Sequence, residues 1–515
     1  MVFTSPLPPV EIPDVALTGY VLAHAARLGD KPALIDGPSG RTLTYAGLAG
    51  AAHALAGGLA SRGFGKGDVL ALLAPNVPEY AIVFHGVALT GGTITTINPT
   101  YTAEEVRKQL DDSKATILIT IGMFLETART AAEGSTVTSI YTLDPVDGVE
   151  QATALFGSPL AEQVPVDPAQ DVVVLPYSSG TTGISKGVML THRNLVANVV
   201  QVLEAADIRE DETFIAFLPF FHIYGMQVLM NTGLRAGATI VTMPRFDLEQ
   251  FLSIHQEYGI TRSFVAPPIV VALAKHPMVD QYDLSKLKQV FSGAAPLSAE
   301  LALEAGARIG CEVVQGYGMT EMSPVSHLTP PGQFKPGSVG VTAPSTETRI
   351  VDPVTQKDLG VGEDGEVVVR GPQVMIGYLG NKAATDAMLD PDGWLHTGDI
   401  GHIDEDGHLF IVDRLKELIK YKGFQVPPAE LEALLLTHPG IADAAVVGIP
   451  DEEAGEIPVA HVVPRPGVEL DPDEVMAFVA GHVAHYKQVR KVVVTDAIPK
   501  SASGKILRRM LRDAG

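Results

Sequence analysis

The chain has 515 residues, of which 46% are hydrophobic, and this is enough for more than one domain with a sizeable core. Its formal net charge of -23 argues against general binding to nucleic acid or anionic membranes, so an anionic ligand needs a locally basic site. The single cysteine, Cys311, excludes an internal disulfide framework and favours a reducing cytoplasm. There is no apolar run of about 20 residues and no secretory signal pattern at the start, so we expect a cytoplasmic protein.

Up to about Gly340, short apolar runs alternate with helical patterns. The runs predicted to be strands include residues 69–73, 116–119, 239–241 and 263–265. Such alternation predicts α/β layers with largely parallel sheets.

A glycine- and hydroxyl-rich segment, PYSSGTTGISKGVMLTHRNL, occupies residues 176–195. The preceding residues 172–175 predict a buried strand, and apolar residues from Leu195 onward recur at helical spacing, with Thr191 as N-cap. We therefore expect a strand-to-helix loop, a place where backbone N–H groups commonly hold phosphate. The segment does not match the Walker pattern, because Lys186 is followed by Gly187, so phosphate binding stays open from the loop alone.

From Arg349 to Val412 the pattern changes to short strands and turns, with a hairpin predicted at DEDG, residues 404–407. After Lys420 a compact α+β pattern follows. It comprises helices at 428–435 and 473–483 and strands at 444–447, 458–463 and 491–494. A domain boundary is predicted near residues 414–418, where the all-β pattern ends.

Four more segments follow the loop in order: QGYGMTE at 315–321, WLHTGDIG at 394–401, DRLKELIKYKGFQVPPAELE at 413–432 and PKSASGKILRR at 499–509. This set resembles the acyl-adenylate-forming superfamily of acyl-CoA synthetases, nonribosomal adenylation domains and beetle luciferases over essentially the whole chain. The resemblance implies an α/β fold with a large multi-subdomain N-terminal domain, residues 1–414, made of two α/β layered sheets and a small β-barrel-like part. It also implies a hinge at 415–418 and a small, mobile α+β C-terminal domain at 419–515.

The resemblance further implies a two-step reaction that uses ATP, Mg²⁺ and coenzyme A. A carboxylate attacks the α-phosphate of ATP and releases pyrophosphate, and the acyl-AMP then passes its acyl group to the CoA thiol. Taken singly, Asp399 could be a turn residue, Glu321 a helix-start carboxylate and Arg414 a surface ion pair, so the ordered set of motifs favours the functional interpretation. The ATP and AMP contacts that it implies are Ser178, Ser179, Gly180, Thr181, Thr182, Lys186, Gln315, Gly316, Tyr317, Thr320, Asp399, Arg414, Lys416, Lys420, Gln425 and Lys505, with Glu321 as the Mg²⁺ ligand.

Two lysines are expected to serve the two half-reactions. By the resemblance, Lys505 stabilises charge during adenylation, and a swing about Lys416 then brings Lys420 to the site. The candidate catalytic residues are Lys505, Lys420, Thr320, Glu321 and His222. The CoA contacts that the resemblance implies are Arg245, Lys422, Gly423 and Phe424.

The segment LPFFHIYG, residues 218–225, bears on the choice of acid. Amino-acid-activating relatives place an aspartate where this chain has His222, and a buried ammonium without that partner is costly, so a plain carboxylic acid is favoured. This segment, SGAAPL at 292–297, and Pro324 with Val325 are most similar to 4-coumarate:CoA ligases. Ala294 replaces a glycine common in the plant enzymes and Val228 a serine, which favours cinnamate or 4-coumarate over more hydroxylated rings. The acyl pocket that this implies comprises Tyr224, Val228, Ala294, Gly318, Pro324, Val325 and Leu328.

Several alternatives remain open from the sequence. A medium-chain fatty acid could replace the aryl-propenoic acid, a separate carrier protein could replace CoA, and a catalytically inactive ligand-binding protein is a rival of another class. Expected partners are the small-molecule acid, ATP and CoA, with no nucleic acid and no membrane, in a monomer or homodimer. Cys311 has no nearby histidine to activate it, which favours a buried structural thiol over a nucleophile.

Overall fold

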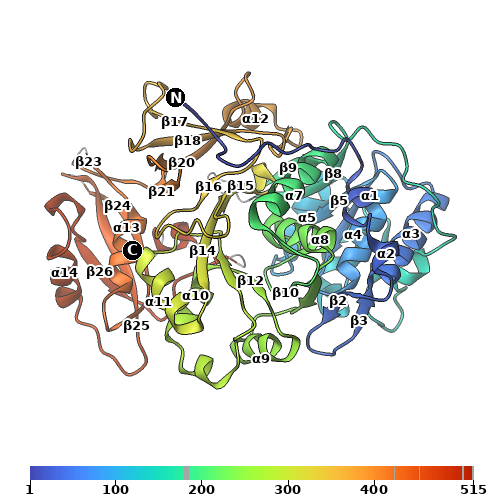
Figure 1. Cartoon of the computed structure of the whole chain (residues 1–515), viewed down its shortest axis with the longest axis horizontal. Helices are drawn as coiled ribbons and strands as arrows, with labels where there is room; N and C mark the ends of the chain where they lie inside the picture. The colour runs from blue at the N-terminus through green and yellow to red at the C-terminus, as the bar shows by residue number, and fades with distance from the viewer. Residues whose placement is uncertain (179–184, 423, 452, 502–503, 513–515) are drawn as a thin grey trace.

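The computed structural model describes residues 1–178, 185–422, 424–451, 453–501 and 504–512. Two mainly parallel sheets form most of the N-terminal part (Figure 1). The seven-stranded sheet has the order β19 (Gly377–Tyr378), β9 (Lys186–Thr191), β8 (Val172–Ser178), β5 (Thr93–Thr96), β4 (Val69–Leu73), β6 (Ile117–Thr120) and β7 (Ser139–Thr142). The nine-stranded sheet has the order β16 (Val341–Thr342), β15 (Val325–Leu328), β14 (Glu312–Gly318), β13 (Gln289–Ser292), β12 (Arg262–Val265), β10 (Thr213–Ala216), β11 (Thr239–Thr242), β2 (Pro32–Asp36) and β3 (Thr42–Thr44).

Both faces of each large sheet are buried, because side chains alternate between two layers along a strand. In β4, Leu70 and Leu72 join the largest apolar core, whereas Val69, Ala71 and Leu73 join a second core on the other face. The largest core also takes residues from α1 (Leu17–Val21), α2 (Ala25–Leu28), α3 (Tyr45–Ser61), α4 (Glu79–Leu89), α7 (His192–Ala206), the π-helix η3 (Tyr224–Asn231) and α8 (Thr232–Ala236). The outer faces are covered by α5 (Ala103–Ser113) and α6 (Leu125–Ala132) on one sheet and by α9 (Leu248–Tyr258), α10 (Pro267–Lys275) and α11 (Ala299–Ile309) on the other.

A third, five-stranded sheet is antiparallel throughout and lies at the top of Figure 1, with α12 (Lys382–Met388) beside it. The predicted hairpin at 404–407 is confirmed, because Ile403 pairs with Leu409 across it. The strands are β1 (Val2–Thr4), β17 (Glu347–Val351), β18 (Gly365–Arg370), β20 (Leu395–Ile403) and β21 (Leu409–Arg414).

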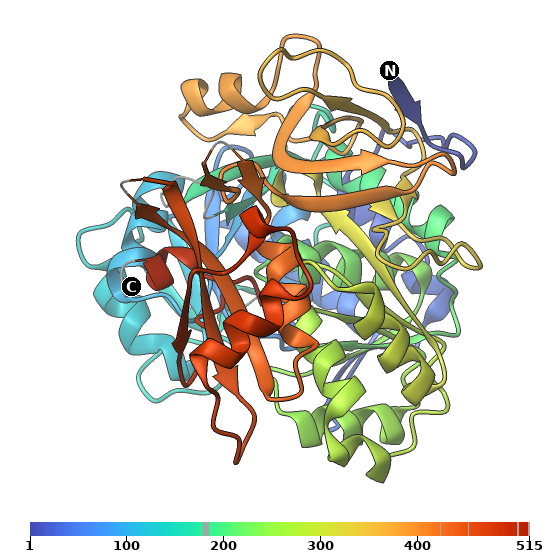
Figure 2. The ribbon, with the colours of Figure 1, turned by 90° about the vertical axis from the view of Figure 1, so that its left-hand side faces the viewer.

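The C-terminal α+β unit has its own sheet and its own apolar core, and it faces the viewer in Figure 2. Helix α13 (Pro428–Leu436) begins with Pro428 at its first position, where a missing N–H costs nothing. Its Leu431 and Leu435 pack on Val446 and Val462 of the sheet. The remaining elements are β22 (Ile419–Tyr421), β23 (Phe424–Val426), β24 (Ile441–Asp451), β25 (Gly455–Pro464), α14 (Pro472–Ala480), β26 (Lys491–Val494) and α15 (Arg508–Arg512).

The strand-to-helix interpretation of the glycine-rich segment is wrong. Strand β9 lies within the segment and pairs antiparallel with β8, so the two strands form a hairpin, and α7 begins only after β9. The short apolar run before α7 was predicted as part of the loop, although Val188 and Leu190 alternate as a buried strand should. Thr191 is confirmed as the N-cap, since its hydroxyl accepts from the Asn194 N–H at 3.2 Å. Helix α14 ends at Ala480, three residues before the predicted end.

Across the part of the chain that the structure describes, no helix is both long enough and apolar enough to cross a membrane.

Candidate active site

A buried carboxylate lies where the third sheet meets the nine-stranded sheet. Asp399 on β20 pairs in register with Arg414 on β21, and the guanidinium Nε lies 3.1 Å from its Oδ1. The hydroxyl of Tyr317, near the end of β14, donates to Asp399 Oδ2 at 2.6 Å. Burial raises the pKa of Asp399, and Arg414 and Tyr317 counteract that shift by stabilising the charged form. This is a preorganised acceptor for hydroxyl groups of a ligand.

The backbone around Asp399 explains its position. Gly398 adopts φ +69°, a region that side chains avoid, and its N–H donates to Glu366 Oε1 at 3.1 Å. The Thr397 hydroxyl accepts from the Asp399 N–H at 3.1 Å. The sequence Thr-Gly-Asp is therefore a turn-like irregularity in a strand, which directs the carboxylate into the site.

A second carboxylate, Glu321, lies in the single 3₁₀ turn (Thr320–Met322) that follows β14. It is 4% exposed, and its Oε1 accepts from the Ser178 hydroxyl at 2.9 Å and from the Tyr378 hydroxyl at 2.7 Å. The ammonium of Lys186 lies 5.2 Å from the centre of the Tyr378 ring. Three strands, β8, β9 and β19, thus bring hydroxyl groups and a cation to one carboxylate.

Glu321 fits a magnesium site in which one protein carboxylate binds the ion and the substrate phosphates supply further oxygen ligands. The described part of the chain contains no group of three or more His, Cys, Asp or Glu side chains placed to hold a metal. A lone carboxylate is nevertheless suitable for Mg²⁺, which takes oxygen ligands and is often held through one or two carboxylates plus substrate phosphates and water.

Lys505 lies in the same region, although it comes from the C-terminal unit. The bridge between Lys500 and Ile506 closes a tight turn, and a Cβ on Gly504 would lie only 3.0 Å from the Cβ of Ala266, just before α10. Burial lowers the pKa of Lys505, as does Arg414, while Glu417 and Asp399 raise it. His222 has its pKa lowered to about 4, first by burial and then by Lys505, so its imidazole is neutral near pH 7.

Two residues that the sequence did not single out hold this arrangement together. Glu417 lies inside the DRLKELIK motif, and its Oε2 is 2.6 Å from Arg508 Nη1. The same guanidinium lies 2.7 Å from Glu432 on α13. Glu417 and Arg508 could have been found from the motifs that contain them, DRLKELIK and PKSASGKILRR, whereas Tyr378 is recognisable only once distant segments are brought together.

The predicted acyl-pocket residues lie on or beside η3, β13, β14 and β15. Tyr224 and Val228 are buried on η3, and the Tyr224 hydroxyl donates to the Phe291 carbonyl at 3.2 Å. Pro324, Val325 and Leu328 lie at β15 and are buried or partly buried. A Cβ on Gly318 would lie 2.2 Å from the Pro324 carbonyl oxygen, so this close approach requires glycine.

Ala294 is exposed and adopts φ +71°, a backbone conformation that suits glycine better than alanine. It follows Gly293, where a Cβ would lie 3.1 Å from the Tyr224 ring. A glycine at position 294 would therefore change the backbone strain as well as the pocket volume.

The predicted CoA and thioester residues are not brought to this site. Lys420 and Gln425 pair across the β22–β23 hairpin with exposed side chains, and Lys422 is exposed too. Phe424 is 53% exposed and stacks on Tyr486 at 4.6 Å between ring centres.

Arg245 lies exposed before α9, and Lys416 lies exposed between β21 and β22. The predicted nucleotide residues Gln315, Gly316 and Thr320 lie on or directly after β14, beside Tyr317. The predicted residues Ser179, Gly180, Thr181, Thr182 and Gly423 lie outside the described residues.

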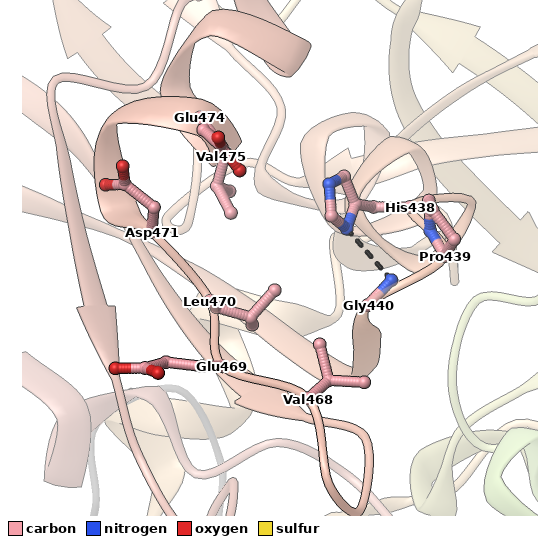
Figure 3. A pocket seen from close by; sticks show the side chains of 9 residues that line it. All are labelled: His438, Pro439, Gly440, Val468, Glu469, Leu470, Asp471, Glu474 and Val475. Atoms are coloured by element: carbon pink, nitrogen blue, oxygen red, sulfur yellow. Dashed lines mark hydrogen bonds between the residues drawn. The ribbon is translucent and has the colours of Figure 1, made fainter.

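A shallow depression of about 310 Å³ lies far along the C-terminal unit, between the end of α13 and the start of α14 (Figure 3). Its lining includes Glu469, Asp471 and Glu474, and His438 Nδ1 accepts from the Gly440 N–H at 3.1 Å. Three carboxylates repel an anionic nucleotide, so the candidate site is the Asp399–Glu321–Lys505 region.

Cys311 precedes β14 and is half-buried rather than fully buried. Burial raises the pKa of its thiol to about 11, so the thiolate is scarce near pH 7. The expectation of a non-nucleophilic thiol fits this environment.

Asp399 with Arg414 and Tyr317, Glu321 with its two hydroxyl donors, and the half-buried Lys505 form one cluster of charged groups on a two-part α/β fold. The family model described as AMP-binding enzyme matches residues 21–379, and the model for the AMP-binding enzyme C-terminal domain matches residues 430–505. The chain belongs to the AMP-binding enzyme family.

Curated relatives match along almost the whole chain. 4-Coumarate--CoA ligase 3 of Oryza sativa subsp. japonica is 46% identical, over 99% of this chain and 94% of its own length. 4-Coumarate--CoA ligase 2 of Petroselinum crispum is 44% identical, over 99% of this chain and 96% of its own length.

Among solved structures, ATP-bound MatB of Rhodopseudomonas palustris has a TM-score of 0.88 at 30% identity, over 96% of this chain and 98% of that one. The anthranilate CoA ligase AuaEII in complex with anthranoyl-AMP has a TM-score of 0.89 at 25% identity, over 99% of this chain and 98% of that one. The predicted fold, with a large N-terminal and a small C-terminal part, is confirmed.

Proposed function

We propose that this protein is an ATP-dependent acid:CoA ligase that acts on cinnamate- and 4-coumarate-type acids. The observation that carries the proposal is that the segment with Lys505 packs against Ala266 of the large domain, which brings Lys505 within electrostatic range of Asp399, Arg414 and His222. The near full-length identity to 4-coumarate–CoA ligases supports the same activity and the same substrates, ATP, CoA and an aryl-propenoic acid.

The first half-reaction requires neutralisation of charge. A carboxylate is a poor acceptor for a thiol, because its charge repels nucleophiles and oxide is a bad leaving group. The substrate carboxylate therefore attacks the α-phosphorus of ATP and pyrophosphate leaves. Asp399 binds the ribose hydroxyls, Arg414 holds Asp399 in place, and Lys505 stabilises negative charge on the reacting oxygens. Thr320 contacts the α-phosphate in this proposal, and the 178–186 segment with Lys186 holds the other phosphates.

Glu321 would hold Mg²⁺ together with the phosphates, and the ion would supply further neutralisation of charge. The Ser178 and Tyr378 hydroxyls orient the Glu321 carboxylate.

In the second half-reaction the CoA thiol attacks the acyl carbon and AMP leaves. Lys420, Lys422, Phe424 and Gln425 lie on an exposed hairpin, so their participation requires a rotation of the C-terminal unit about Lys416. We therefore retain the division into residues 1–414, a hinge at 415–418 and a mobile unit at 419–515. Arg245, in the N-terminal domain, binds a phosphate of CoA in this proposal.

The residues of the predicted acyl pocket favour a carboxylic acid whose ring carries no charged group. His222 is neutral near pH 7 and accepts from the Tyr224 N–H at 3.3 Å, so it offers no negative charge to an amino-acid ammonium. Tyr224 and Val228 give an apolar wall. The protein is a monomer or homodimer in this proposal, and the single cysteine supports a reducing compartment such as the cytoplasm.

The test is a pyrophosphate-release screen over cinnamyl, benzoyl and fatty acids, with the CoA thioester identified by mass. We expect kcat/KM to be highest for 4-coumarate or cinnamate and to fall for dodecanoate. A dodecanoate value equal to that for 4-coumarate would favour the fatty-acid alternative, and thioester formed only on a phosphopantetheinylated carrier would favour a carrier loader. If none of the acids in the panel causes pyrophosphate release, the alternative of a catalytically inactive ligand-binding protein is favoured.

A further inference from the structure

One wall of the candidate acid pocket lacks a strand neighbour on one side. Val325 begins β15 and lies opposite Gly318 of β14, where the pairing register is irregular. On its other side, β16 pairs only with His327 and Leu328, so it ends before reaching Val325. The Val325 N–H and C=O on that side need another partner, because an unpaired buried backbone group is costly.

The carboxamide of Asn198 on α7 is that partner. Its Nδ2 donates to the Val325 carbonyl at 2.8 Å, and its Oδ1 accepts from the Val325 N–H at 3.3 Å. An amide side chain has a donor and an acceptor side by side, as a backbone peptide does, so it replaces a strand residue. Asn198 is 0% exposed, and Val325 is partly buried.

The orientation of this amide is fixed by a second amide. The other Nδ2 hydrogen of Asn198 points to Gln201 Oε1 at 3.1 Å. Gln201 Nε2 is in turn bonded to the Pro344 carbonyl at 2.9 Å and to Gln373 Oε1 at 3.0 Å. A flipped Asn198 amide would set an NH₂ group against the Val325 N–H, so the network specifies one arrangement.

The same helix is also hydrogen-bonded to η3, which carries the predicted acyl-pocket residues Tyr224 and Val228. Gln227 of η3, one turn from Tyr224, donates from Nε2 to the Leu195 carbonyl of α7 at 2.6 Å. Leu195 and Asn198 are three residues apart and therefore lie about one turn apart on the helix. Both η3 and β15 are thus hydrogen-bonded to one short stretch of α7.

We propose that Asn198 is a positioning residue that sets the width of the acid pocket and thereby limits which ring substituents the enzyme accepts. This inference rests on the proposed function, because it assumes that Tyr224 and Val325 face the acid. Asn198 touches no substrate and acts only through the backbone of Val325.

The test compares Asn198→Leu, which has a similar size but no amide, with wild type. We expect the KM for 4-coumarate to rise about tenfold, because the Val325 backbone loses both hydrogen bonds to the amide, while the KM for ATP stays within about twofold. We also expect the ratio of kcat/KM for sinapate, which carries two added methoxy groups, to that for 4-coumarate to rise by several-fold. Asn198→Asp keeps the acceptor and loses the donor, so it should shift the ratio in the same direction and serves if the leucine variant does not fold.

Gln163→Leu is the matched control, because this amide also donates to backbone carbonyls, those of Ala88 and Leu89, at the end of α4 away from the acid pocket. It should lower the melting temperature without changing the sinapate ratio. An Asn198 variant that melts earlier but keeps the wild-type ratio and KM would show a merely structural role and overturn the inference. If wild type accepts no aryl-propenoic acid, the proposed function fails, and the ratio measured between a narrow and a wide acid of the accepted class still tests Asn198.

Discussion

The two lysine-bearing segments of the C-terminal unit lie in opposite environments. The Lys505 segment packs against Ala266 of the large domain, and burial, followed by Arg414, lowers the pKa of Lys505, while Glu417 and Asp399 counteract that shift. The Lys420 hairpin is exposed, and its residues pair with one another. One small domain therefore presents one surface to the site and leaves the other in solvent. Under the proposed function, this arrangement corresponds to the adenylation half-reaction, and the thioester half-reaction requires the other surface to face the substrates.

The largest effect is expected for Lys505→Ala. Removal of one well-placed charge typically costs about 10²–10³-fold in rate, so formation of the acyl adenylate should nearly stop. Synthetic acyl-AMP plus CoA should still react near the wild-type rate, because Lys505 turns away for that step. Measuring both half-reactions separately checks this, and equal slowing of the two would end the alternating model for this protein.

Lys420→Ala should show the opposite pattern. Loss of a charged hydrogen bond to the adenylate should slow thioester formation by about tenfold or more, while pyrophosphate release in the first turnover changes little. The assay is single-turnover kinetics with preformed acyl-AMP, and Lys382→Ala, an exposed lysine on α12, is the control. Slowed adenylation with normal thioester formation would reverse the assignment of the two surfaces.

Lys416→Pro addresses the connection between the two surfaces. Lys416 lies exposed between β21 and β22, and proline fixes φ at the position where rotation is expected. We expect several-fold slower thioester formation with adenylation largely preserved. Unchanged rates of both half-reactions would place the pivot elsewhere.

Ala294→Gly should leave both lysine steps intact and change the choice of acid. The φ of +71° at Ala294 favours glycine, so the variant should be stabilised by about 1 kcal/mol. Loss of the methyl group should also raise kcat/KM for caffeate relative to cinnamate. Denaturant unfolding measures the stability, and kcat/KM for caffeate and for cinnamate measures the choice of acid. An unchanged caffeate-to-cinnamate ratio would show that Ala294 does not line the acid pocket.

The smallest expected effect is a pH dependence of folding stability that arises near Asp399, in the region that Lys505 faces. His396, three residues before Asp399, lies 3.1 Å from Glu366, and this hydrogen bond raises its pKa. A raised folded-state pKa stabilises the protein below the unfolded value near 6.5, and this contribution is lost as the pH rises through the folded-state pKa. Wild type should therefore exceed His396→Gln in stability by up to about 1 kcal/mol at pH 6 and by less at pH 9. A difference that grows toward pH 9 would contradict the sign.

Local patterns in the sequence predicted much of the fold because they depend on near neighbours. The apolar runs at β4, β11 and β12 and the cap at Thr191 need only a few adjacent residues. The hairpin between β8 and β9 was missed because a short buried strand directly before a helix has no distinct period of its own.

The sequence by itself determined the family and the chemical types at the site, because ordered motifs such as QGYGMTE and SASGK carry the required carboxylates and cations. Only the tertiary structure decided which of them meet. Lys505 comes within electrostatic range of Asp399 because the C-terminal unit docks against α10, and Tyr378 meets Glu321 because β19 joins the edge of the seven-stranded sheet. The support of the acid pocket by Asn198 was equally invisible, since a carboxamide finds its backbone partner 127 residues away only after the chain has folded. Contacts between distant segments depend on packing of whole elements, and no local period or spacing encodes them.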